Sequence, residues 1–70
     1  MWEVGAVPGR VGELVSWVLD RTDAVAQVYR SDEPDPRVVV IDPTGRPLPS
    51  PPPGLIARPP HSWLFEAVSR

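Results

Sequence analysis

The sequence contains no cysteine, no lysine and no asparagine, and it has a single histidine. The absence of cysteine excludes disulfides and thiolate metal or redox sites. One histidine leaves little for a transition-metal site within one chain, so we expect neither a metal nor another cofactor. All seven basic residues are arginines, and the net charge of −2 predicts no positive field that would attract nucleic acid.

Long apolar runs are also missing, and no stretch approaches the length of a membrane span. Glu3 lies where a secretory signal would carry positive charge. We therefore expect a cytoplasmic protein with no membrane contact. The absence of lysine and the 11 prolines are typical of a GC-rich bacterial genome.

A chain of 70 residues predicts one small domain, spanning residues 1–70. Domains of this size bury only about 60% of the surface that the unfolded chain exposes, and they are marginally stable unless disulfides, metals or oligomerisation help. Because the composition disfavours disulfides and metals, oligomerisation is the remaining means of stabilising the domain.

The most apolar stretch is Val-Val-Val-Ile at positions 38–41, between Arg37 and Asp42. β-branched residues favour a strand over a helix, and a run without polar alternation predicts a strand that is buried on both faces. A chain of this length can cover one of those faces. The other face predicts a partner, in the simplest case a second copy of the chain. The candidate interface residues are Val39, Ile41, Tyr29 and Gln27.

Three elements are predicted before this stretch. Residues 2–7 form a first strand, with alternate side chains on each face. A helix follows from Arg10, because apolar residues recur at the spacing of one helix face. These residues are Val11, Leu14, Val15 and Val18, with Leu19 at the edge of the stripe. A second strand at 24–30 leads through the polar turn 31–36 into the apolar strand, as an antiparallel hairpin.

The C-terminal part differs in composition, because most of the prolines fall in segment 46–60. We expect this segment to be irregular and to cover the domain, with Trp17 among its contacts. Residues 46–52 also match the RxLPxxP pattern that SH3 domains bind as a polyproline helix. We favour the covering role, in which proline lowers the entropy of the unfolded chain. Residues 62–68 predict a last strand, apolar on both sides.

Three short motifs within the first 42 residues point to a known family. The first is a short strand followed by Pro-Gly-Arg at 8–10 and a helix with Glu13-Leu14. The second is Ala-Gln-Val-Tyr-Arg-Ser-Asp at 26–32, which ends a strand in an acidic hairpin, and the third is the return strand 38–41. With the order β-α-β-β-(irregular)-β, the chain resembles the ferredoxin-like fold. More specifically, it resembles the dimeric α/β-barrel superfamily, which includes the antibiotic-biosynthesis-monooxygenase-like proteins.

The resemblance implies an α+β fold with a four-stranded antiparallel sheet, the first and third strands central and one helix on one face. It also implies dimerisation through the opposite face of the sheet. A proline-rich segment stands where the superfamily has its second helix. Monooxygenases of the superfamily use no metal, and they have a pocket between their helices and the sheet.

Four side chains are candidates for a ligand pocket: Trp17, Tyr29, His61 and Trp63. His61 is the only residue that titrates near neutrality, but no spacing supplies the orienting partner that a catalytic histidine needs. Tyr29 combines an apolar ring with a polar handle, as interface aromatics do. The tryptophans favour core and covering contacts over a pocket for a flat apolar ligand. Prolines interrupt the acidic turn 31–36, which therefore lacks the ligand spacing of a calcium loop.

Together these patterns predict a small homodimeric protein that binds a partner or a small apolar ligand, accessory or regulatory in a bacterial pathway and without catalytic residues. The alternative is a cofactor-independent monooxygenase or cyclase-like enzyme acting on an apolar aromatic substrate, with His61 and Tyr29 as its catalytic residues. That alternative requires an enclosed cavity toward which one of the two points. A third possibility is an adaptor that adds the edge strand 24–30 to a partner's sheet.

Overall fold

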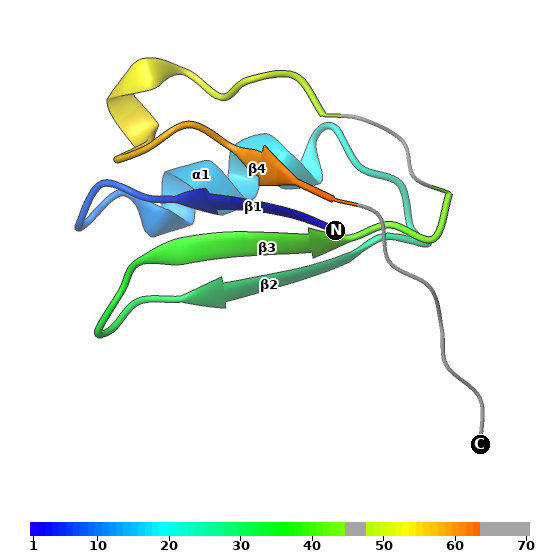
Figure 1. Ribbon diagram of the computed structural model, residues 1–70, viewed down its shortest axis with the longest axis horizontal. Coiled ribbons are helices and arrows are strands. Elements are labelled where there is room, and N and C mark those ends of the chain that lie inside the picture. Colours follow the sequence, from blue (N-terminus) through cyan, green and yellow to red (C-terminus); the bar gives the residue numbers. More distant parts are fainter. Residues whose placement is uncertain (45–47, 64–70) are drawn as a thin grey trace.

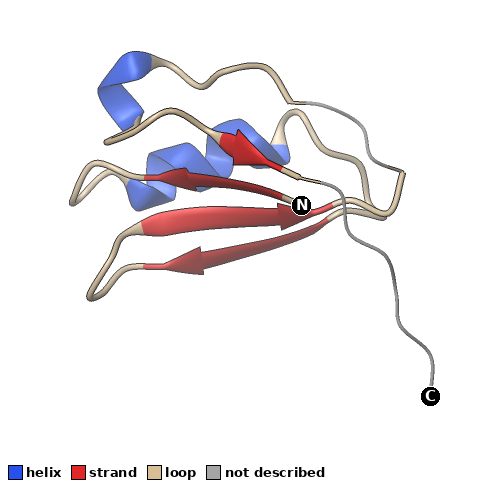
Figure 2. Ribbon diagram, in the orientation of Figure 1, coloured by secondary structure: helices blue, strands red, loops and turns tan. Residues whose placement is uncertain are grey.

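The computed structural model describes residues 1–44 and 48–63 (Figure 1). Its elements in chain order are β1 (Trp2–Gly5), α1 (Val11–Leu19), β2 (Gln27–Ser31), β3 (Arg37–Ile41), the 3₁₀ turn η1 (Pro53–Leu55) and β4 (His61–Ser62). Within the described residues the strands form one antiparallel sheet in the order β2-β3-β1-β4, with α1 against one face (Figure 2). The predicted α+β class and the central positions of the first and third strands are therefore confirmed.

The register of β3 decides which side chains meet the helix. Val40 lies opposite Trp2 on β1 and Val28 on β2, and Val38 lies opposite Val4. These side chains share one face, because neighbouring strands in register project alternate residues to the same side. Val38 and Val40 are buried in the core beneath α1, whereas Val39 and Ile41 project to the opposite face and are partly exposed.

The core lies between α1 and the sheet. Helix α1 contributes Val11, Leu14 and Val18, three residues of the predicted apolar stripe. Leu19, at the edge of the stripe, is 55% exposed. The full set of buried apolar residues is Trp2, Val4, Ala6, Val11, Leu14, Val18, Val38, Val40 and Leu55.

Residues 48–60, here called the strap, pair with the C-terminal end of β1 on the same side as β4. The Val7 amide donates to the Leu55 carbonyl at 3.0 Å, and the Ala57 amide donates to the Gly5 carbonyl at 2.8 Å. Leu55 enters the core, and Ile56 packs against it. These contacts make the strap a short extension of the sheet, although its sequence predicts no strand.

Trp17 lies on α1, packed against the core and partly buried. The Arg21 guanidinium sits 4.3 Å from the centre of its ring, close enough for a cation–π interaction, and donates a hydrogen bond to the Trp17 carbonyl at 3.1 Å. Arg21 therefore also satisfies a carbonyl of the last helical turn, where a cation is favoured by the helix dipole.

Three element boundaries differ from prediction. The second strand begins at Gln27 rather than residue 24, because Asp23 accepts hydrogen bonds from the amides of Val25 and Ala26 and holds them in a turn. The helix begins at Val11, one residue later than predicted, with Arg10 as its N-cap residue; Gly9 has φ +85° and closes the preceding turn. Strand β1 ends at Gly5, before the predicted end of the first strand.

The last strand was predicted at 62–68. Strand β4 covers His61–Ser62, and residues 64–68 lie outside the described part of the chain. The strand therefore starts one residue earlier than predicted. Both of its residues pair with β1, His61 with Glu3 and Ser62 with Trp2.

Replacing Leu14 by alanine tests the role of the buried stripe. Leu14 is fully buried, so the substitution should lower the free energy of unfolding by about 2–5 kcal/mol, the usual range for a leucine-to-alanine cavity. Leu19→Ala on the same helix is the matched control and should change it by about 0.5 kcal/mol or less. Urea denaturation followed by circular dichroism measures both, and equal effects would contradict the assigned helix face.

Candidate functional site

The face of the sheet opposite α1, here called the open face, gathers most of the residues singled out in the sequence. The strand register shows which side chains project from this face. Glu3 lies opposite both Val39 and His61, and Tyr29 lies opposite Val39. Glu3, Tyr29 and His61 therefore project to the same side as Val39, away from the helix. Within residues 1–44 and 48–63, no helix or strand packs against this face.

One end of the open face, here called the apolar end, carries aliphatic and aromatic side chains. Val39 and Ile41 are partly exposed at its centre. Tyr29 on the edge strand β2 is 53% exposed, and Trp63, just after the other edge strand, is 42% exposed. The aromatic rings thus lie at opposite edges of the same surface.

Local contacts orient these aromatic side chains. The Tyr29 hydroxyl donates to the side-chain carbonyl of Gln27 at 3.0 Å. The His61 and Trp63 rings meet edge to face, 5.5 Å apart at 83°. The Trp63 amide donates to the Met1 carbonyl at 2.9 Å, which extends the β1–β4 pairing by one residue and keeps Trp63 on the open face.

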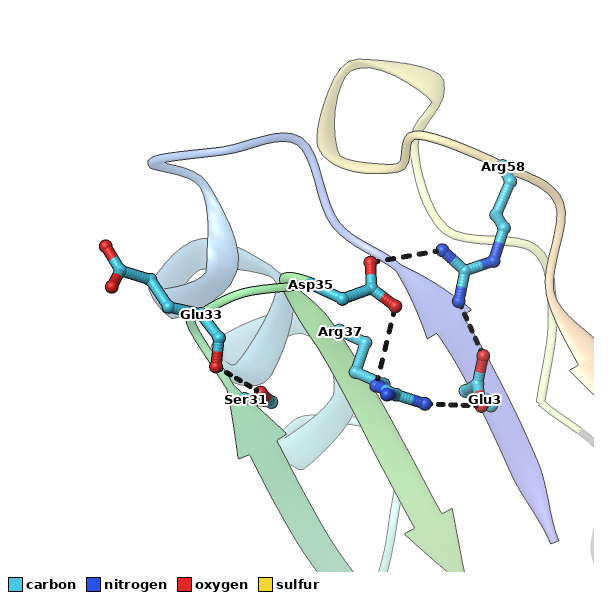
Figure 3. A network of polar contacts seen from close by, with 6 residues as sticks. All are labelled: Glu3, Ser31, Glu33, Asp35, Arg37 and Arg58. Atoms are coloured by element: carbon cyan, nitrogen blue, oxygen red, sulfur yellow. Dashed lines mark hydrogen bonds and ion pairs between the residues drawn. The ribbon is translucent and has the colours of Figure 1, made fainter.

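A closed network of four ionic side chains, here called the charged end, lies toward the β2–β3 turn and extends to Glu3, which is level with Val39 (Figure 3). Arg58 of the strap donates to Glu3 at 2.6 Å, and Arg37 of β3 donates to the second oxygen of the same carboxylate at 3.4 Å. Asp35 lies 3.8 Å from both guanidinium groups. The network contains two carboxylates and two guanidinium groups, so its net charge is zero.

Gly5 makes this arrangement possible. A Cβ atom at position 5 would lie 2.1 Å from a terminal nitrogen of Arg58, far inside van der Waals contact. Arg58 can therefore cross β1 and reach Glu3 only because position 5 has no side chain. Gly5 is the last residue of β1, and the neighbour that approaches it belongs to the same chain.

The charges around Glu3 lower its pKa. The hydrogen bond from Arg58 is the largest cause, the positive charges of Arg58 and Arg37 add to it, and partial burial opposes it. The Glu3 side chain is 21% exposed, against 44% for Arg58. Glu3 is therefore held ionised near the middle of the sheet and anchors the strap from the open face.

The structure places the four pocket candidates on two sides of the sheet. Trp17 packs on the helix side, whereas Tyr29, His61 and Trp63 belong to the open face. The sheet separates Trp17 from the other three.

The four interface candidates lie together, since Val39, Ile41, Tyr29 and Gln27 share the open face on the neighbouring strands β2 and β3. Sequence reasoning did not find the Glu3–Arg58 pair, whose members are 55 residues apart. The one signal that pointed toward it was Gly5.

Part of the polyproline pattern packs against the domain of the same chain. Pro51 is buried, and Leu48, three residues earlier, packs against the core. Both residues of the pattern are therefore engaged by the chain's own domain. Arg46 and Pro47 lie outside the described residues.

Comparison with known proteins found no matching family model, no matching curated protein and no matching solved structure. In the described ranges, no three acidic, histidine or cysteine side chains gather as a metal site. No helix there is long and apolar enough to cross a membrane. The fold and the site define a small α+β domain with one sheet face packed under a helix and the other bearing an apolar and a charged end.

The lowered pKa of Glu3 predicts an acid dependence of stability. Its folded pKa lies below its ordinary value of 4.5. The stabilisation that it provides is therefore complete above about pH 4.5 and is lost as the pH falls through the lower folded value. At pH 7, Glu3→Gln should lower the free energy of unfolding by about 1 kcal/mol or less, and the difference from wild type should shrink as the pH falls below 4.5. Urea denaturation over this pH range measures it.

Glu13→Gln is the matched control for that experiment, because Glu13 pairs with Arg10 at 2.8 Å on the exposed side of α1. Its effect on the free energy of unfolding should be small at neutral pH, as for other exposed pairs. A Glu3→Gln effect that persists unchanged in acid would contradict the ionic role of Glu3.

Gly5 and Arg58 should be energetically coupled. In wild type, Gly5→Ala should be destabilising, because the added methyl displaces the Arg58 guanidinium from Glu3. In an Arg58→Ala background the same change should be neutral or stabilising, because alanine reduces the freedom of the unfolded chain. A double-mutant cycle by urea denaturation measures the coupling. Identical effects of Gly5→Ala in both backgrounds would show that Arg58 does not lie over position 5.

Proposed function

We propose that this chain is a small homodimeric interaction protein whose binding surface is the open face. The observation that supports the proposal is the gathering of Val39, Ile41, Tyr29 and Trp63 on a face that no described helix or strand covers. Aromatic side chains surrounded by aliphatic ones are typical of the centres of protein interfaces. An accessory or regulatory role, in which the dimer holds a partner or a small apolar ligand, is the function that such a surface supports best.

The charge of the open face favours a second copy as the occupant. Its charged end carries Glu3, Asp35, Arg37 and Arg58, which sum to zero, so the face gives no electrostatic preference to a strongly acidic or basic partner. A neutral surface with both signs of charge can face itself. Two-fold homodimers, in which one patch meets the same patch, are also the commonest oligomers.

The area of the open face sets the strength of the association. Strands of four, five, five and two residues, rising about 3.3 Å per residue and spaced about 4.8 Å apart, cover about 250 Å² in plan. Side-chain relief raises the accessible area, so a dimer would bury on the order of 1,000 Å² in total, at the lower limit of specific interfaces. We therefore expect a reversible, concentration-dependent dimer.

The resemblance to the dimeric α/β-barrel superfamily supports the same surface. The sheet order β2-β3-β1-β4 is the order which that resemblance implies, and the superfamily dimerises through the face opposite its helices. The motifs behind the resemblance lie in the first 42 residues, which include β1, α1, β2 and β3.

The enzyme alternative has less support from the geometry. It requires a cavity on the helix side, toward which Tyr29 or His61 points. Leu55, Ile56 and Trp17 pack into or against the core on that side, whereas Tyr29 and His61 project from the open face. We therefore favour an interaction protein over a monooxygenase or cyclase-like enzyme.

An aspartate at position 41 tests the proposal. Ile41→Asp should weaken dimerisation by at least about tenfold, because an interface carboxylate without a partner costs more than 1.4 kcal/mol. The helix-side core should persist, since Ile41 projects away from it. Sedimentation equilibrium over a concentration series measures association, and circular dichroism verifies folding. Ser16→Asp, on the exposed side of α1, is the control and should dimerise like wild type. A wild-type chain that stays monomeric at millimolar concentration would refute the homodimer.

A further inference from the structure

Strand β2 forms one edge of the sheet, and no described strand pairs with its outer side (Figure 1). The backbone hydrogen bonds of its neighbours show which of its residues face outward. The Ala6 amide donates to the Pro36 carbonyl at 2.9 Å. Val38 and Val40 therefore also direct their backbone groups toward β1, because such bonds recur at every second residue of an antiparallel ladder.

Alternate residues of β3 bond to β2 instead. Their register partners are Ser31, Tyr29 and Gln27. The residues between these partners, Val28 and Arg30, therefore point their N–H and C=O groups out of the sheet. Ala26 is the next outward-facing position, and it donates its amide to the Asp23 carbonyl at 3.2 Å. Strand β2 thus offers two donors and two acceptors along its outer side, at Val28 and Arg30.

The edge at β2 lacks the usual protection against pairing with another strand. Natural edge strands are commonly blocked by proline, by a bulge or by a charged side chain. Strand β2 contains no proline, and its register with β3 is continuous. Its one charged side chain, Arg30, is paired with Asp32 at 2.6 Å. On the other side of the sheet, β4 and the proline-rich strap pair with β1, so β2 is the edge that can accept a further strand.

Exposed apolar side chains gather along the same edge. Leu19, Val25 and Tyr29 are each more than half exposed. Val25 leads into β2, and Tyr29 is its central residue. Helix α1 packs over β2 and β3, and Leu19 shares a helix face with Gly12. A Cβ atom at Gly12 would lie 4.0 Å from a terminal nitrogen of Arg30, which places this helix face on the β2 side. The unpaired backbone groups and the exposed apolar side chains therefore coincide.

A second copy of β2 matches this edge. Two copies related by a two-fold axis perpendicular to the sheet run antiparallel, and only outward-facing residues can exchange backbone bonds. When Val28 of each copy lies opposite Arg30 of the other, the outward groups of both strands are all paired. Sliding one copy by two residues in either direction leaves a single such pair within β2. In one of those two registers Arg30 also lies opposite Arg30, and like charges in that position are destabilising.

We propose that β2 of one copy pairs antiparallel with β2 of a second copy, with Val28 opposite Arg30 and Tyr29 opposite Tyr29. The central tyrosines then form a non-hydrogen-bonded pair, in which side chains are closest. The contact is separate from the open face and does not depend on dimerisation through that face. It joins the four strands of each copy into one continuous sheet, with both helices on one side and both open faces on the other.

Disulfide trapping tests this register, because the chain has no cysteine of its own. Opposite residues in a non-hydrogen-bonded pair have Cα atoms about 4.5 Å apart, within reach of a disulfide. Sheets packed face to face lie about 10 Å apart, which is out of reach. Under mild oxidation, Tyr29→Cys should therefore form a disulfide-linked dimer several-fold faster than Ser50→Cys, whose exposed position on the strap gives the collisional rate.

A mixture of Gln27→Cys and Ser31→Cys chains checks the same register at a second place. These two positions lie opposite each other in the proposed pairing, so the two chains should link to each other. Neither chain should link rapidly to itself. The products are identified by mass after non-reducing electrophoresis.

A proline at position 28 tests the backbone bonds. Val28→Pro removes an N–H that points out of the sheet, so the β2–β3 ladder should persist, and circular dichroism verifies it. In the Tyr29→Cys chain, this change should slow disulfide formation to the rate of Ser50→Cys. Val28→Ala is the matched control, because it shortens the side chain and keeps the N–H, and it should leave the rate unchanged.

The outcomes separate this contact from the open face. If Tyr29→Cys links no faster than Ser50→Cys, a second copy does not pair with β2 and the inference is overturned, leaving the edge to an extended segment of another protein. If it links rapidly but Gln27→Cys and Ser31→Cys do not link to each other, the register is wrong. Ile41→Asp should leave the Tyr29→Cys rate unchanged while it weakens association through the open face. Rapid linking at position 29, together with wild-type association of Ile41→Asp, would refute the open-face dimer and support the β2 contact.

Discussion

The burial of β3 beneath α1 is the contact on which the rest of the structure depends. Val38 and Val40 enter the core next to Leu14 and Val18 of the helix. Because strand side chains alternate, the contact that buries these two valines also sends Val39 and Ile41 to the open face. A strand with apolar residues at every position must present half of them to the face opposite the helix. Within the described residues no helix or strand packs on that face.

The strap connects the two sides of the sheet. Because it runs along β1 in an extended conformation, its residues reach both faces from one edge. Leu55 completes the core on the helix side, while Arg58 crosses Gly5 and binds Glu3 on the open face. A proline-rich segment can therefore cover the edge of a small sheet where a helix would cover only one of its faces.

The ionic network also makes the two ends of the open face chemically different. It neutralises the end near the β2–β3 turn and leaves Val39, Ile41, Tyr29 and Trp63 as the apolar remainder. Because the four charges are paired within the chain, the open face can meet a partner without burying an unpaired charge, which would be costly.

Local pattern determined much of this fold. The β-branched run at 38–41, the helical stripe from Val11 and the polar turn at 31–36 were enough to predict a hairpin packed under one helix, because each depends on neighbours a few residues away. The start of β2 was predicted too early, because side-chain and backbone hydrogen bonds to Asp23 compete with strand pairing. Only the tertiary structure decided that Glu3 meets Arg58 and that Trp17 and Tyr29 lie on opposite sides of the sheet. Those facts depend on how the chain returns to β1 after some fifty residues, and periodicity along a sequence carries no record of such a return.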